Sequence, residues 1–115
     1  MHMCGWSGEP NQIELWQDYP VKVVNWAVFV ENMTLEQGRK FFGGRTCLGG
    51  YETHWDGHIQ QGIIYHGTKE ELWEYTRELI LNHGKLGLML GGDCTIDAKI
   101  DWERLRWIVE AARSL

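Results

Sequence analysis

Short apolar segments alternate with helix-forming segments along almost the whole chain, and this alternation most constrains the fold. The segments Val21–Val28, Arg45–Gly49 and Leu86–Leu90 have the apolar or β-branched composition of buried strands. Helices are predicted before, between and after them. Because such alternation is typical of parallel sheets with helical crossovers, the sequence predicts an α/β fold whose strands all end at one edge of the sheet.

Two of the predicted helices begin with a capping box, in which a threonine precedes Gln or Glu by three positions. Thr34 with Gln37 opens the first of these helices, and Thr68 with Glu71 opens the second. Gly84 supplies a C-terminal cap for the second helix. Residues on one face of this second helix are predicted to be buried: Leu72, Thr76, Leu79 and Ile80.

The remaining segments complete an α-β-α-β-α-β-α order. Glu9–Asp18 is predicted as a helix that stops before Pro20, and Met1–Gly5 as the end of a preceding strand. Gly50–His66 is predicted as a long loop, and no hairpin signal is assigned to the chain. Asp101 caps a last helix. The predicted buried stripe of this helix contains Trp102, Leu105, Ile108, Val109 and Ala112.

Composition narrows the class of protein. A chain of 115 residues with 43% hydrophobic residues is expected to form one domain, residues 1–115. Its apolar runs fall short of the ~20 residues of a membrane span, and its start lacks the pattern of a secretory signal, so a cytoplasmic protein is expected. Eleven basic against sixteen acidic residues give a net charge of −5, which argues against nucleic-acid binding.

Three residues form a candidate metal site. In extended backbone His2 and Cys4 point to the same side, and Cys94 follows the Leu86–Leu90 strand at the edge where strands end. One nitrogen and two sulfur ligands with an open fourth position is how catalytic zinc is held. The alternative is that Cys4 and Cys94 are buried small residues and that His2 belongs to a frayed terminus.

Other candidate residues receive simpler interpretations. Cys47 lies inside a predicted strand and is expected to be a packed side chain. The cluster His54-Trp55-Asp56-Gly57-His58 suggests a second metal site, although glycine in such a cluster is more typical of a loop. His83 beside the predicted helix end is explained by the helix dipole.

Several short motifs, taken together in order and spacing, resemble the C-terminal part of the uroporphyrinogen decarboxylase superfamily. They are His2-x-Cys4-Gly5, Val24-Asn25-Trp26, Gly43-Gly44-Arg45, Leu48-Gly49-Gly50-Tyr51, Tyr65-His66-Gly67-Thr68-Lys69-Glu70-Glu71, Gly91-Gly92-Asp93-Cys94-Thr95 and the closing segment from Ile100 to Ala111. The resemblance implies the C-terminal half of a (β/α)₈ TIM barrel, from about strand five to helix eight. It therefore places the substrate- and corrinoid-contacting residues of the first half outside this chain.

The superfamily that these motifs resemble has two chemistries. Its decarboxylases remove acetate carboxyl groups from a porphyrinogen without a cofactor, whereas its methyltransferases move methyl groups between a corrinoid and a thiol and hold zinc through His-x-Cys and a later Cys. This chain has His2-x-Cys4 and Cys94, and it reads Gly92-Asp93-Cys94 where a decarboxylase has Gly-His-Gly. The resemblance thus implies Zn²⁺ bound by His2, Cys4 and Cys94, with a corrinoid protein or methylcobalamin and a small thiol as partners.

Two alternatives to zinc-dependent methyl transfer stay open. One is decarboxylation of a porphyrinogen, a lyase reaction of tetrapyrrole biosynthesis, and the other is a catalytically inactive half-barrel that serves as an interaction piece. Three strands and the end of a fourth cannot close a barrel of about eight strands. We therefore expect a homo-oligomer, and we expect the 115-residue chain alone to be inactive.

Overall fold

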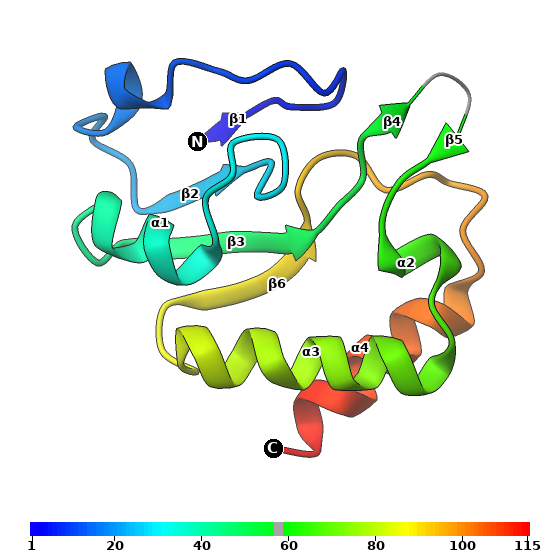
Figure 1. Ribbon diagram of the computed structural model, residues 1–115. Helices are drawn as coiled ribbons and strands as arrows, with labels where there is room; N and C mark the ends of the chain where they lie inside the picture. The colour runs from blue at the N-terminus through cyan, green and yellow to red at the C-terminus, as the bar shows by residue number, and fades with distance from the viewer. Residues whose placement is uncertain (57–58) are drawn as a thin grey trace.

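The computed structural model describes residues 1–56 and 59–115 (Figure 1). Its strands are β1 (His2–Met3), β2 (Val23–Trp26), β3 (Thr46–Tyr51), β4 (Trp55–Asp56), β5 (Ile59–Gln60) and β6 (Leu88–Gly92). Its helices are a 3₁₀ turn η1 (Ile13–Trp16), α1 (Leu35–Phe41), α2 (Ile63–His66), α3 (Lys69–His83) and α4 (Trp102–Arg113).

The main sheet has four strands in the order β1-β2-β3-β6, and each neighbouring pair is parallel. β4 and β5 form a separate antiparallel pair. The predicted α/β class with parallel strands alternating with helices is therefore confirmed, and the arrangement is compatible with part of a barrel. All four strands of the main sheet point in the same direction, and the longer connections of the chain follow their C-terminal ends (Figure 1).

One face of the main sheet packs against helices and forms the larger core. Val24, Trp26 and Cys47 are fully buried on this helix-side face, in a cluster with Leu35 and Phe42 of the α1 region. The Trp26 and Phe42 ring centroids lie 5.4 Å apart. Because buried aromatic rings contribute large apolar areas, this cluster supplies much of the stability of the fold.

The opposite face carries a row of residues in register across all four strands. His2 pairs with Asn25, Asn25 with Leu48, and Leu48 with Met89. Successive residues of a strand point to opposite faces, so this row faces away from Trp26 and the helices. We call these four residues the open face, since His2 is exposed and Met89 is 47% exposed.

The capped helices form as predicted. Both capping boxes are present at Thr34 and Thr68, and the predicted face of α3 buries Leu72, Thr76 and Ile80. The α3 helix has 15 residues, and within residues 1–56 and 59–115 no helix combines the length and the apolar character needed to cross a membrane.

The predicted buried stripe of the last helix is partly wrong. Ile108 and Ala111 are buried, whereas Trp102 is 74% exposed and Val109 is also exposed. Arg104 explains this rotation, because its Nε donates to the Ile64 carbonyl at 2.6 Å. Its guanidinium also binds the carbonyls of Ile63 and Gly67 in the α2 region, which turns the Arg104 side of α4 inward.

The predicted helix over Glu9–Asp18 is also wrong, since the structure has only the four-residue turn η1 within this range. The backbone on both sides of this turn is hydrogen-bonded to distant side chains. The backbone N–H of Asn11 donates to the Glu31 carboxylate, and the Arg45 guanidinium donates to the carbonyls of Gln17 and Tyr19. These contacts with distant side chains hold the segment in short turns, in which the N–H groups of Leu15 and Tyr19 donate to carbonyls three residues earlier. Ile13 of the turn is buried in the larger core.

The predicted loop Gly50–His66 contains more structure than expected. β3 runs on to Tyr51, β4 and β5 pair as an antiparallel hairpin, and α2 closes the segment. The two residues between the paired strands, Gly57 and His58, lie outside the described residues. β6 also begins two residues later than predicted, after the turn at Gly87.

Candidate metal centre

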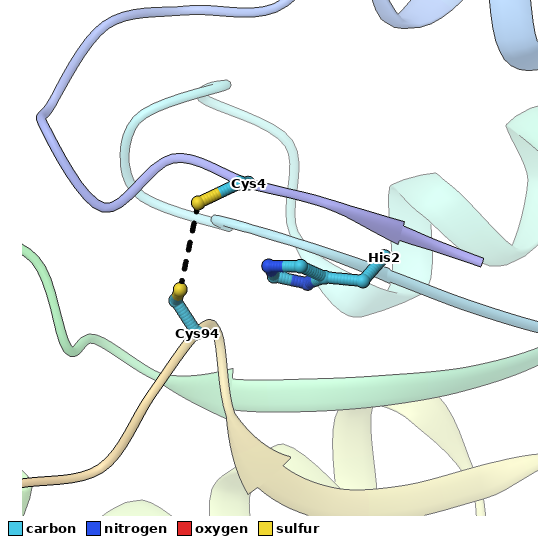
Figure 2. A group of neighbouring side chains, drawn as sticks. All are labelled: His2, Cys4 and Cys94. Atoms are coloured by element: carbon cyan, nitrogen blue, oxygen red, sulfur yellow. Dashed lines mark hydrogen bonds between the residues drawn. The ribbon is translucent and has the colours of Figure 1, made fainter.

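The ends of the two edge strands of the main sheet meet in space. Cys4 follows β1 and Cys94 follows β6, yet their Sγ atoms lie 3.6 Å apart (Figure 2). In a flat sheet these strands would be three spacings, about 14 Å, apart, so the sheet must curl to bring the two cysteines together. The ligand atoms of His2, Cys4 and Cys94 all lie within 4.8 Å of one another. The structure thus brings the three predicted ligands together.

This geometry fits a tetrahedral zinc ion. Two thiolates at the usual Zn–S distance of ~2.3 Å and a tetrahedral angle would be about 3.8 Å apart, close to the separation of Cys4 and Cys94. Thiolate and imidazole ligands also match the preference of zinc. No fourth His, Cys, Asp or Glu joins the group in the described part of the chain, so three protein ligands would leave one position open.

Asn25 orients the imidazole of His2 through a hydrogen bond. The Asn25 amide nitrogen donates to the Leu48 carbonyl at 2.8 Å and lies 3.3 Å from the Gly92 carbonyl. Its oxygen is therefore the acceptor toward His2 Nδ1, which must carry the proton. In the neutral imidazole the lone pair is then on Nε2, and Figure 2 shows the ring extending toward the two sulfurs. Such an outer hydrogen bond fixes the tautomer of a ligating histidine.

Asp93 anchors the end of β6 to the neighbouring strands. Its two carboxylate oxygens accept the backbone N–H groups of Val28 and Gly50, each at 2.9 Å. The side chain is 2% exposed, and this burial raises its pKa to about 6 although the two N–H groups favour the charged form. Asp93 therefore ties together the ends of β2, β3 and β6 directly beside Cys94.

A hydrogen bond and a tight turn fix the backbone of Cys94. Its N–H donates to Thr53 Oγ1 at 2.9 Å, and Thr53 is buried. A methyl group on Gly92 would lie 2.7 Å from the Cys94 carbonyl oxygen, so the turn after β6 requires glycine. Burial, with the adjacent Cys4 thiol, raises the pKa of the metal-free Cys94 thiol.

Of the other candidate residues, none that the structure describes joins this group of ligand atoms. Cys47 is buried on the helix-side face, as predicted, and burial raises its pKa to about 11. His54 Nδ1 lies 2.9 Å from a Glu52 carboxylate oxygen. His58, the other histidine of the suggested second metal site, lies outside the described residues. His83 ends α3, and its Nδ1 donates to the Gly84 carbonyl at 2.9 Å.

The sequence predicted the three candidate ligands but not the residues that contact and position them. Asn25 is a polar residue inside an apolar strand, and a buried polar side chain needs a hydrogen-bond partner. Its position in the sequence therefore indicated a polar contact at this strand. Asp93 and Thr53 carried no comparable signal, since their roles depend on contacts between strand ends.

Comparison of the chain with protein-family models, with curated proteins and with solved structures gives no match.

Proposed function

We propose that His2, Cys4 and Cys94 hold a zinc ion and that this centre activates a small thiol for methyl transfer from a corrinoid. The observation that carries the proposal is the convergence of three ligand atoms within 4.8 Å, without a fourth ligand from the described residues. Zinc bound in this way supplies a Lewis acid that lowers the pKa of a thiol in the open position. The motif order that resembles the methyltransferase branch supports the choice of corrinoid and thiol.

Several residues of the chain would orient the ligands of such a centre. Asn25 accepts a hydrogen bond from His2 Nδ1, which leaves Nε2 as the ring nitrogen that would bind the metal. Asp93 and Thr53 hold Cys94 at the end of β6, while Cys4 approaches from the opposite edge of the sheet. His2 and Cys4 are exposed, which leaves the site open to a small molecule from solvent.

Zinc content of the purified chain tests the first part of the proposal. Protein prepared without chelators is expected to contain about one zinc per chain by elemental analysis, and Cys94→Ser is expected to weaken zinc binding by at least a hundredfold. Cys47→Ser is the matched control, because Cys47 lies on the other face of the sheet and should leave zinc content unchanged. A zinc-free wild-type chain, or equal zinc in the Cys94→Ser variant, would contradict the proposal.

Thiol binding tests the second part. With Co²⁺ in place of zinc, addition of small thiols should increase sulfur-to-metal charge-transfer absorption, whereas the corresponding alcohols should not. A spectrum that thiols leave unchanged would contradict an open, thiol-accepting position.

Methyl transfer is then measured as demethylation of methylcobalamin in the presence of the same thiols. We expect the 115-residue chain alone to bind thiol without turnover, and a longer protein that contains it together with the first half of a barrel to turn over. Release of carbon dioxide from uroporphyrinogen at a comparable rate would instead favour the decarboxylase alternative.

We also propose that two copies of this chain associate through the open face. Four parallel strands are half of the eight that close a barrel, and β1 and β6 have free outer edges in the part of the chain that the structure describes. A two-fold axis along such a barrel would place β6 of each copy beside β1 of the other, parallel to it. The exposed Met89 would then become buried.

A further inference from the structure

The two sulfur atoms of the candidate metal centre are close enough to react with each other. Cys4 and Cys94 come from opposite edges of the sheet and lie 90 positions apart in sequence, with their Sγ atoms 3.6 Å apart. A disulfide has an S–S distance of ~2.05 Å, so closing the bond requires a shift of about 1.5 Å. Cys4 lies just beyond the two-residue edge strand β1, where such a shift is accommodated outside the sheet.

We propose that Cys4 and Cys94 form a reversible disulfide under hydrogen peroxide and that its formation releases the metal ion. The release of metal rests on the zinc site proposed above, whereas the disulfide itself rests on the 3.6 Å separation of the sulfurs. His2 would be the one remaining ligand after both thiolates are consumed, and one imidazole does not retain zinc. Oxidation would therefore close the site and remove its activity until the disulfide is reduced.

Accessibility sets the order of the two reaction steps. The exposed Cys4 thiolate attacks one peroxide oxygen; the O–O bond breaks, hydroxide leaves and Cys4 becomes a sulfenic acid. The less accessible Cys94 thiolate then attacks the Cys4 sulfur; the S–S bond forms, the S–O bond breaks and a second hydroxide leaves. Both hydroxides are protonated to water, so two electrons pass from the two sulfurs to one peroxide molecule.

The third cysteine provides an internal comparison. Cys47 is fully buried on the helix-side face, and burial raises its pKa to about 11. A buried thiol with a raised pKa is unreactive toward oxidants. Because peroxide reaches the exposed Cys4 but not the fully buried Cys47, we expect Cys4 to react with peroxide more than about tenfold faster than Cys47.

The experiment treats zinc-loaded and metal-free chain with a small molar excess of hydrogen peroxide. The expected product has a mass lower by two hydrogens and a peptide map that links Cys4 to Cys94. A chromogenic chelator should report one zinc released per disulfide formed, and dithiothreitol should restore zinc binding. Cys47→Ser should behave like the wild type, whereas Cys4→Ser and Cys94→Ser should form no link within the chain.

Three outcomes overturn the inference. They are oxidation of Cys4 and Cys94 to sulfinic acids without a link, a link that includes Cys47, and a zinc-loaded chain that keeps its metal while the metal-free chain is cross-linked. Failure of this inference and failure of the proposed function are distinguishable. A chain that binds no zinc but forms the disulfide refutes the proposed function and the metal release, whereas a chain that binds zinc and never forms the disulfide refutes this inference alone.

Discussion

The two faces of the main sheet are built from the same strands but have opposite character. On the helix-side face, Val24, Trp26 and Cys47 are fully buried among apolar neighbours. On the open face, one register position away, His2 and Asn25 are joined by a hydrogen bond and Met89 is exposed. Because side chains alternate along a strand, four strands can carry a stable core on one side and a reactive group on the other.

The three cysteines show what this separation does to one residue type. Cys47 is fully buried among apolar side chains, whereas Cys4 and Cys94 lie side by side at the strand ends. The chemistry of each cysteine therefore follows from its face and strand position rather than from its immediate sequence. This comparison gives four predictions, which concern stability, pH, metal affinity and association.

The largest expected effect is loss of the helix-side core. Trp26→Ala should lower the free energy of unfolding by roughly 3–5 kcal/mol, because it leaves a large cavity beside Phe42. Met89→Gln, on the open face, should change the stability of the monomer by less than about 0.5 kcal/mol. Urea unfolding at a fixed low protein concentration measures both. If both variants lost a similar free energy of unfolding, the two faces would contribute equally to stability, which would contradict this prediction.

The second prediction concerns Asp93, which is buried like the core but lies beside Cys94 of the candidate metal centre. Its folded pKa of about 6 exceeds the value of ~3.9 expected in the unfolded chain. Between these values the folded state keeps a proton that the unfolded state has lost. The free energy of unfolding of the metal-free chain should therefore fall as pH rises from about 4 to about 6. The contribution of Asp93 to this fall is on the order of 3 kcal/mol, and above pH 6 Asp93 should add no further pH dependence.

Asp93→Asn isolates this contribution, since the variant has no titrating group at that position. Chemical unfolding of metal-free wild type and variant at several pH values gives two curves, and their difference should contain the slope between pH 4 and pH 6. Parallel curves would mean that Asp93 does not carry the proton.

The third prediction concerns Asn25, the residue of the open face that orients His2. Asn25→Ala removes the acceptor for His2 Nδ1 and should weaken zinc binding by about 10- to 100-fold. Asn25→Asp keeps an acceptor oxygen and should retain more of the affinity. A competition titration with a chelator of known affinity measures both variants. Equal affinities for the alanine and aspartate variants would assign Asn25 a purely structural role.

Periodicity and capping signals were sufficient to predict the alternation, the parallel sheet and the boundaries of α3, because these depend on local backbone preferences. They failed where distant side chains hold the backbone: Arg45 binds carbonyls at the end of the first predicted helix, and Arg104 of α4 binds carbonyls of the α2 region. Tertiary contacts of this kind join residues that are far apart in the sequence, so local sequence patterns do not predict them.

The candidate site also has one part that the sequence predicted and another part that depends on tertiary contacts. His2 and Cys4 share a face because of their spacing, and Cys94 follows a strand that was visible in the sequence. The curl of the sheet that closes the distance between Cys4 and Cys94, and the bonds from Asn25 and Asp93, arise from packing between strands. Sequence therefore indicated the ligands, whereas their support became visible in the structure.

The smallest expected effect is on association, and it tests whether the open face is a surface that a second copy covers. For a folded dimer that unfolds to monomers, each tenfold rise in protein concentration should add about 1.4 kcal/mol to the apparent stability. The midpoint of thermal unfolding should therefore rise with concentration. Met89→Lys places a charge on the face that would be buried, so it should abolish this dependence and shift sedimentation toward the monomer. Met89→Leu, which keeps an apolar side chain, is the matched control. A wild-type monomer whose midpoint is independent of concentration would show that the open face remains in contact with solvent in the isolated chain.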